Sequence, residues 1–175
     1  MGKKFITIEG IDGVGKTSLG KRLAQFLDAE FIQTPYFADH AKDDYEDKFT
    51  YYLSDLKKIQ PLLNEKLLNK SIVCDRYLHS TVAYQTNLHD VEPLFERYNL
   101  LVPDVSILLT IEDNNVRLKR LENRKSEGGI ITDLDYESEK LKNINERFKR
   151  MSGLYTIDTT NKDIETVWQE MQVIL

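Results

Sequence analysis

Residues 10–17 read Gly10-Ile11-Asp12-Gly13-Val14-Gly15-Lys16-Thr17, which matches the pattern G-x-x-x-x-G-K-[ST]. The apolar run Phe5-Ile6-Thr7-Ile8 comes before this stretch, and apolar residues at helical spacing follow it. A strand, a short loop and a helix are therefore expected in that order. Glycines let such a loop curl until its backbone N–H groups point at phosphate oxygens above the helix N-terminus. The stretch predicts a phosphate-binding loop.

The residues of this loop have distinct expected tasks toward a nucleoside triphosphate. The Lys16 ammonium would reach the outer phosphates, and the Thr17 hydroxyl would bind Mg²⁺. A glycine-rich turn without a ligand could have the same letters, but its position between a strand and an amphipathic helix favours the phosphate site. The predicted nucleotide-binding residues here are Gly10, Ile11, Asp12, Gly13, Val14, Gly15, Lys16, Thr17 and Ser18.

Composition places the chain among ordinary soluble globular proteins. It has 175 residues, of which 41 % are hydrophobic and 30 % charged, and this length predicts one domain over residues 1–175. The net charge of −5 argues against a nucleic-acid-binding surface. Cys74 is the single cysteine, so a disulfide framework is excluded. With no signal peptide and no apolar run of 18 residues, we expect a cytoplasmic protein without a membrane partner.

Short apolar strands alternate with amphipathic helices along the chain. The strands are expected at 5–8, 31–32, 71–74, 105–111 and 154–157, and the longest helix at 49–67. This order predicts an α/β fold with a five-stranded parallel sheet and helices on both faces. Residues 126–132 form a polar, glycine-containing segment that we interpret as a flap. Ligands of such sheets bind outside the carboxyl ends of the strands, where Gly10, Pro35, Asp75 and Asp158 are expected.

Several segments, taken together and in order, resemble thymidylate kinases, which are P-loop kinases that pass the γ-phosphate of ATP to dTMP. The resemblance covers nearly the whole chain and is far more specific than the phosphate loop alone. The segments are Glu9 to Thr17, Asp75-Arg76-Tyr77 followed by Ser80, Ala83-Tyr84-Gln85, Pro103-Asp104 before an apolar strand, and Arg120 and Arg124 before the flap.

For the donor side, this resemblance implies a site that surrounds the phosphates of ATP with cations. Lys16, Mg²⁺ on Thr17, and Arg124 from the flap would stabilise the transferred group, while Arg120 would lie nearer the adenine. Asp75 would orient the Mg²⁺ or its waters. Some thymidylate kinases have an arginine inside the phosphate loop, but this chain has Gly13 and Val14 there. The flap arginine would have to replace it.

For the acceptor side, the resemblance implies that Arg76 holds the acceptor phosphate and that Asp12 lies near the acceptor ribose and phosphate. Alignment on Pro61 puts Tyr52 at the position of a base-stacking aromatic, with Thr81 and Tyr84 beside the base and sugar. Tyr52 also shares a helical register with Phe49 and Leu56, so core packing is an alternative for it. The catalytic residues implied by the resemblance are Lys16, Arg76, Asp12 and Arg124.

The acceptor side departs from the family pattern at two places. Four residues after the stacking aromatic, the family has an arginine that reads the thymine carbonyl, whereas this chain has Leu56. After the second strand, the family reads arginine-glutamate-proline-glycine, whereas this chain reads Gln33-Thr34-Pro35-Tyr36. Losing a charged hydrogen-bond donor can change substrate preference tens-fold. The identity of the base is thus the part of the assignment that these residues affect most.

Two other functions remain open. A deoxynucleoside kinase would share the phosphate loop and the Asp-Arg segment, but it needs a general base for the 5′-hydroxyl, placed as a glutamate after the second strand. Position 34 is threonine, which favours an acceptor that is already a monophosphate. The third possibility is a nucleotide-binding protein without turnover. Thymidylate kinases are generally homodimers, and helix 49–67 has apolar positions that could serve an interface.

Two sets of residues are interpreted as lying mainly at the surface, apart from the nucleotide-site roles given above to Arg120 and Arg124. The histidines show no metal-binding spacing and are interpreted as surface or loop residues; they are His40, His79 and His89. The helix after residue 112 has basic residues that would decorate faces other than its apolar stripe, namely Arg117, Lys119, Arg120, Arg124 and Lys125. For Arg120 and Arg124, a solvated face is the alternative to the nucleotide site.

Overall fold

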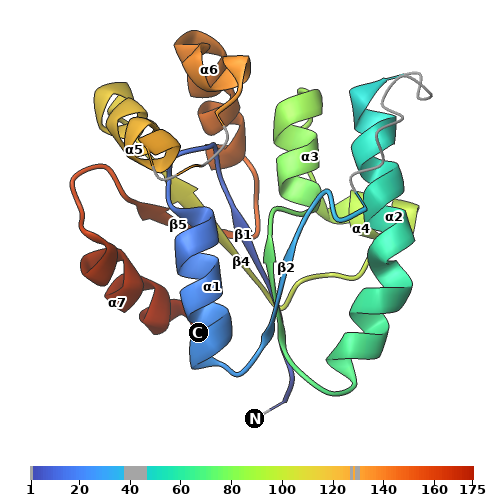
Figure 1. Ribbon diagram of the computed structural model, residues 1–175. Helices are drawn as coiled ribbons and strands as arrows, with labels where there is room; N and C mark the ends of the chain where they lie inside the picture. The colour runs from blue at the N-terminus through green and yellow to red at the C-terminus, as the bar shows by residue number, and fades with distance from the viewer. Residues whose placement is uncertain (1, 38–46, 127, 129–130) are drawn as a thin grey trace.

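The computed structural model describes residues 2–37, 47–126, 128 and 131–175. These residues form one five-stranded sheet with the strand order β2-β3-β1-β4-β5 (Figure 1). Every neighbouring pair is parallel. This confirms the predicted sheet. The strands are β1 (Phe5–Glu9), β2 (Glu30–Gln33), β3 (Ile72–Asp75), β4 (Val105–Thr110) and β5 (Leu154–Asp158).

Helices cover both faces of the sheet (Figure 1). They are α1 (Lys16–Phe26), α2 (Lys48–Leu67), α3 (Leu78–Gln85), α4 (Glu92–Tyr98), α5 (Asn114–Ser126), α6 (Ser138–Lys149) and α7 (Ile164–Ile174), with a 3₁₀ helix η2 (Asp133–Tyr136). Helices α1 and α7 lie side by side, and the rings of Phe26 and Trp168 meet edge to face 5.4 Å apart. Helices α2, α3 and α4 lie on the other side. Within the described ranges, none of the helices combines the length and apolarity that crossing a membrane requires.

The central strands are buried on both faces, which explains their continuous apolar sequence. All residues of β1 and β3 are buried, including Cys74 at 0 % exposure. One polar pair links β1 to β4, because the Thr7 hydroxyl donates to the Ser106 hydroxyl at 2.9 Å. The carboxylate of Asp104 accepts the Phe5 N–H at 2.7 Å and so fixes the start of β1.

The carboxyl ends of the strands meet at one edge, as the sequence predicts. Gly10 follows β1, Asp75 ends β3 and Asp158 ends β5. The Arg76 N–H donates to the Ile8 carbonyl at 2.9 Å and thereby keeps the β3–α3 junction against β1. The phosphate-loop sequence and the Asp-Arg sequence therefore lie next to each other, although they are far apart in the chain.

One prediction concerns a segment that the structure describes only in part, and another concerns the surface of α2. The expected flap at 126–132 includes residues 127, 129 and 130, which lie outside the described residues, as does His40. The apolar positions of α2 were expected to be available for an interface. Phe49, Leu62 and Leu67 are half-buried within the chain itself, and none of the large apolar side chains of α2 is fully exposed.

Candidate functional site

The phosphate loop joins β1 to the N-terminus of α1 and depends on its glycines. Gly10, Gly13 and Gly15 have φ angles of 135°, 89° and 98°, a region that side chains with a Cβ rarely adopt. A Cβ on Gly10 would also lie 2.3 Å from the Leu109 carbonyl oxygen. Gly15 forms the N-cap of α1, with no side-chain cap on the helix. The loop can therefore present free backbone N–H groups to an anion.

Lys16 lies buried inside this loop. Its ammonium donates to the Ile11 carbonyl at 2.8 Å and lies 3.9 Å from the Asp12 carboxylate. Burial lowers the pKa of Lys16, the positive charge of Arg76 lowers it further, and the resulting value is about 8. Additional negative charge at this place would stabilise the ammonium form, which suits a lysine that receives phosphate oxygens.

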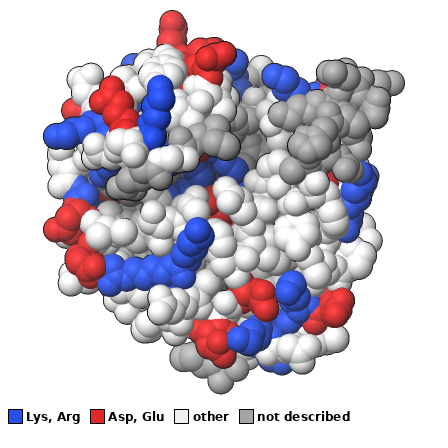
Figure 2. Space-filling model, in the orientation of Figure 1, with Lys and Arg blue, Asp and Glu red and all other residues white. Residues whose placement is uncertain are grey.

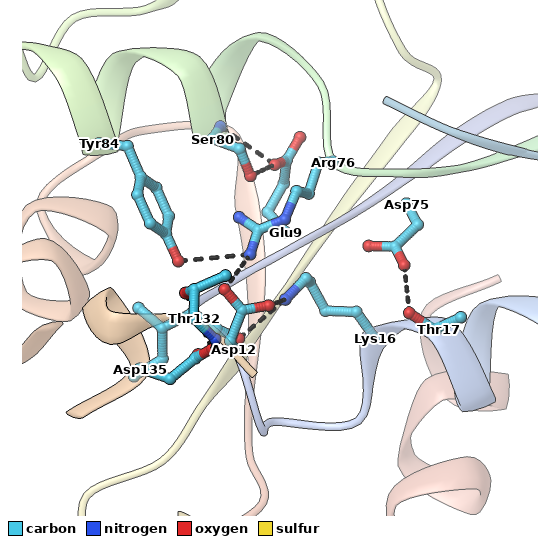
Figure 3. Close-up of polar contacts among 11 residues, drawn as sticks. Glu9, Asp12, Lys16, Thr17, Asp75, Arg76, Ser80, Tyr84, Thr132 and Asp135 are labelled. Carbon is cyan, nitrogen blue, oxygen red and sulfur yellow. Dashed lines mark hydrogen bonds and ion pairs between the residues drawn. The ribbon is translucent and has the colours of Figure 1, made fainter. Parts of the chain in front are cut away.

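Thr17 and Asp75 form an oxygen pair beside the loop (Figure 3). The Thr17 hydroxyl donates to Asp75 Oδ2 at 2.6 Å, while Asp75 Oδ1 is buried without a hydrogen-bond partner among the described residues. Mg²⁺ prefers oxygen ligands and typically takes only one or two from the protein, with the rest from water and phosphate. The unpartnered carboxylate oxygen and the hydroxyl thus fit a magnesium ion held mainly by a nucleotide.

Arg76 lies between the phosphate loop and α3 (Figure 3). Its Nη2 donates to Asp12 Oδ2 at 2.9 Å and to the Tyr84 hydroxyl at 3.3 Å, and its guanidinium stacks 4.9 Å from the centre of the Tyr84 ring. Although burial raises the pKa of Asp12, the charges of Arg76 and Lys16 outweigh it and hold the value at about 2. Asp12 is therefore a carboxylate at neutral pH, paired with a fixed cation.

Two cavities meet at this ion pair. The first has a volume of about 530 Å³ and lies over the phosphate loop and the N-terminal part of α7. The second, of about 350 Å³, lies between α2 and α3. Asp12, Gln33 and Arg76 line both of them. In Figure 2, Lys and Arg atoms are visible within the hollow near the upper centre of the molecule. This arrangement can hold two ligands, one in each cavity, with the ion pair of Asp12 and Arg76 between them.

Most of the predicted donor residues line the first cavity. Gly10 and Ile11 are the exceptions, since neither lines it. Arg120 is held against the loop after β5, because it donates to the Thr159 hydroxyl at 3.0 Å and to the Thr159 carbonyl at 2.6 Å. Arg124 is close enough to Asp12 to lower the pKa of that carboxyl. The residues at this cavity include Asp12, Gly13, Val14, Gly15, Lys16, Thr17, Ser18, Asp75, Arg120 and Arg124.

The predicted acceptor residues come together at the second cavity. Tyr52, Thr81 and Tyr84 line it with Asp12 and Arg76. Tyr52 is half-buried, whereas its chain neighbours Tyr51 and Leu53 are buried. Core packing, the alternative to base stacking, therefore describes these neighbours better than Tyr52. Leu56 also lines this cavity. The place of the family's base-reading arginine is therefore apolar here.

Two residues expected at the surface are buried instead. His79 is only 3 % exposed, and burial lowers its pKa to about 4, so the imidazole is neutral. Arg117 is 1 % exposed. Its Nε donates to Asn114 Oδ1 at 2.9 Å and its Nη2 to the Asp135 carbonyl at 2.6 Å. Both predictions were wrong because packing against α4 and η2, distant in sequence, decides the burial of these side chains.

Arg117 and Glu9 are also the residues near the site whose importance the sequence did not indicate. The Arg117 stem packs on the phosphate loop, since a Cβ on Gly13 would lie 2.8 Å from Arg117 Cγ. Asp135, whose carbonyl Arg117 holds, also accepts the Thr132 N–H at 2.8 Å, and Thr132 lines the second cavity. Glu9 is part of the segment Glu9 to Thr17 that carries the family resemblance, but the sequence assigned it no role of its own.

A parallel sheet with a phosphate loop at its carboxyl edge, and two cavities meeting at an arginine, define a P-loop nucleoside monophosphate kinase. A family model described as thymidylate kinase matches residues 38–171. A probable thymidylate kinase of Methanococcus maripaludis is 30 % identical, with 96 % of this chain and 92 % of that protein covered. One from Methanocaldococcus jannaschii is also 30 % identical, covering 95 % and 93 %. The chain belongs to the thymidylate kinase family.

Solved structures support the same fold. The thymidylate kinase of Candida albicans superimposes with a TM-score of 0.70 at 17 % identity, with 98 % of this chain and 90 % of that chain covered. The thymidylate kinase of Ehrlichia chaffeensis gives a TM-score of 0.61 at 21 % identity, with both chains covered completely. At these identities the likeness concerns the fold. It agrees with the sheet order and helix layers described above.

Replacing Arg117 by alanine is expected to lower the free energy of unfolding by about 2–4 kcal/mol, because a buried charged donor and its stem packing are lost together. Lys119→Ala, an exposed position on the same helix, is the matched control and should cost far less. Equilibrium urea unfolding of the two variants measures both values. Equal losses would show that the buried contacts of Arg117 do not stabilise the fold.

Proposed function

We propose that this chain transfers the γ-phosphate of ATP to dTMP, which gives ADP and dTDP. The main support is the meeting of the two cavities at Asp12 and Arg76, with the phosphate loop at one and Tyr52, Thr81 and Tyr84 at the other. Membership of the thymidylate kinase family supports the same reaction. The proposal treats residues 1–175 as one catalytic domain.

In the donor site, we assign the triphosphate to the phosphate loop and Lys16, and the adenine to the region of Arg120. Thr17 and Asp75 are the residues that would hold Mg²⁺, which supplies charge neutralisation on the phosphates when it is bound. Arg120 is already fixed by Thr159, so its guanidinium group needs no further ordering when the adenine binds. The backbone N–H groups of the loop add donors that do not need to move.

In the acceptor site, Arg76 would bind the phosphate of the monophosphate through its planar guanidinium. An oxygen of that phosphate forms a bond to the γ-phosphorus, and the bond from the γ-phosphorus to its bridging oxygen breaks, which releases ADP. The attacking oxygen is already ionised, so the step needs positioning and charge stabilisation rather than a base. Lys16, Arg76 and Arg124 supply the positive charge, and Asp12 keeps Arg76 in place.

The carboxylates at the second cavity favour a monophosphate over a free nucleoside. Those of its described lining are Asp12 and Asp55. Asp12 is ion-paired with Arg76, and Asp55 accepts the N–H groups of Tyr36 and Phe37 at 2.8 and 2.9 Å. A carboxylate held in this way is a poor general base for a 5′-hydroxyl. A nucleoside kinase therefore has less support from the geometry than a nucleotide kinase.

An acceptor screen with dTMP, dUMP, dCMP, dAMP and the free nucleosides, read out as ADP release with MgATP, tests this function. The proposal expects dTMP to be the preferred acceptor. Consumption of nucleosides in preference to dTMP would identify a nucleoside kinase, and ATP binding without transfer to any acceptor would identify a binding protein. The same preparation tests the predicted homodimer by light scattering. A cytoplasmic location also stays a prediction, which fractionation of cells tests.

Leu56→Arg is expected to sharpen the choice of base. A guanidinium at this position would donate to a carbonyl of thymine and meet the amino group of cytosine, so the ratio of kcat/KM for dTMP over dCMP should rise at least about tenfold. Leu56→Met, which nearly conserves side-chain volume, is the control. An unchanged ratio in the arginine variant would remove position 56 from the base-reading part of the site.

Arg76→Ala is expected to raise the KM for dTMP and to lower kcat on the order of 100-fold, because a fixed cation is removed from the phosphate that reacts. Arg97→Ala on α4, an exposed position that lines neither cavity, should leave both constants unchanged. Steady-state kinetics at saturating MgATP measure the effect. Wild-type constants in Arg76→Ala would place the acceptor phosphate elsewhere.

The affinity for MgATP should decrease as the pH rises through 8. Lys16 has a pKa of about 8 in the free protein, and only its ammonium form attracts the phosphates. If binding requires that form, the dissociation constant rises about tenfold between pH 7 and pH 9. Titration calorimetry at pH 7, 8 and 9 measures the change, and Lys16→Met should bind weakly with little pH dependence. A flat profile for the wild-type protein would contradict the assigned role of Lys16.

A further inference from the structure

Glu9 is the last residue of β1 and is completely buried. We infer that it is a positioning residue, which holds α3 and Arg76 at a fixed place relative to the phosphate loop and so aligns acceptor with donor. The inference rests on the proposed phosphoryl transfer. The Glu9 side chain lines neither cavity. It therefore acts through the groups that it binds.

The first observation is that Glu9 caps α3 from a different strand. Helix α3 begins after Tyr77 and has no side-chain cap of its own. Glu9 Oε2 instead accepts the Ser80 N–H at 3.1 Å and the Ser80 hydroxyl at 2.5 Å (Figure 3). It also accepts the Tyr77 N–H at 3.3 Å. A cap normally comes from the residue that precedes the helix. Here it comes from the residue that precedes the phosphate loop.

The second observation is the backbone of Arg76, which lies between β3 and this cap. Arg76 has a φ angle of 70°, a left-handed conformation that a residue with a Cβ rarely adopts and that persists only where neighbouring contacts enforce it. On one side, the Arg76 N–H donates to the Ile8 carbonyl. On the other side, the next residue, Tyr77, donates its N–H to Glu9. Both anchors are in β1, at neighbouring positions.

The third observation is that the groups fixed by Glu9 are those of the acceptor cavity. Ser80, Thr81 and Tyr84 of α3 line that cavity, and Tyr84 also supports the Arg76 guanidinium. Shortening or removing the Glu9 carboxylate would free the first turn of α3 and the strained junction together. Because a shift of about 1 Å can cost on the order of 100-fold in rate, a group outside the cavities can still control transfer.

The experiment compares Glu9→Asp, Glu9→Gln and Ser80→Ala in the full chain. Glu9→Asp cannot reach α3, and Ser80→Ala removes the shortest of the hydrogen bonds. Both should lower kcat/KM for dTMP by about tenfold or more, while the dissociation constant for MgATP stays within about twofold of wild type. Glu9→Gln keeps an oxygen acceptor at the same reach and should restore most of the activity.

Thr7→Val is the matched control for a purely structural effect. Thr7 is two residues earlier in β1 and its buried hydroxyl donates to Ser106, but it lies away from both cavities. It should lower the melting temperature while the KM for dTMP and kcat remain unchanged. If Glu9→Asp fails to fold, Ser80→Ala and Glu9→Gln still test the inference.

The outcome that overturns the inference is loss of stability in Glu9→Asp and Ser80→Ala with wild-type kcat/KM for dTMP. Glu9→Gln as inactive as Glu9→Asp would also overturn it, because the hydrogen-bond acceptor would then not be the feature that matters. If the wild-type protein itself transfers no phosphate to dTMP, the proposed function fails rather than this inference. The two failures are distinguished by the wild-type assay alone.

Discussion

The ion pair between Arg76 and Asp12 is the interaction on which the site depends. It joins a loop at the end of β1 to a junction at the end of β3, and both cavities end on it. Parallel pairing makes this possible, because Ile8 and Asp75 are register partners and the residues that follow them must come out at the same edge. A cation held by a carboxylate keeps its orientation before substrate binds, and such preorganisation is what charge stabilisation in phosphoryl transfer needs.

The fold followed from local sequence patterns because the order of the patterns along the chain favours one architecture. Short unalternated apolar runs bounded by turn residues are typical of strands buried on both faces, as in β1 and β3. Helices between them require parallel strands. The phosphate loop was recognisable because Gly10, Gly13 and Gly15 adopt backbone conformations that few other residues tolerate. The residues predicted for the acceptor side came from the family resemblance, and Tyr52, Thr81 and Tyr84 line one cavity that local pattern could not reveal.

The buried charges near the site were not predictable in this way. Arg117 belongs to a helix rich in basic residues, and its burial depends on η2, whose Asp135 carbonyl it binds from 18 positions away. His79 looked like a loop residue because nothing in its neighbourhood indicates that α4 packs over it; its ring lies 5.8 Å from that of Phe95. Burial of a polar side chain is decided by which elements meet. That information is in the tertiary arrangement and not in the periodicity of one segment.

The burial of Cys74 determines how its thiol can react. The thiol is completely buried in β3, donates to the Arg76 carbonyl at 3.1 Å, and has a pKa raised by burial and by the nearby carboxylates. Oxidants and alkylating agents react with exposed thiolates, so this thiol, bonded to the backbone of Arg76, is shielded from them while the sheet is intact. The junction between β3 and α3 is thereby insulated from changes in the thiol redox state of its surroundings.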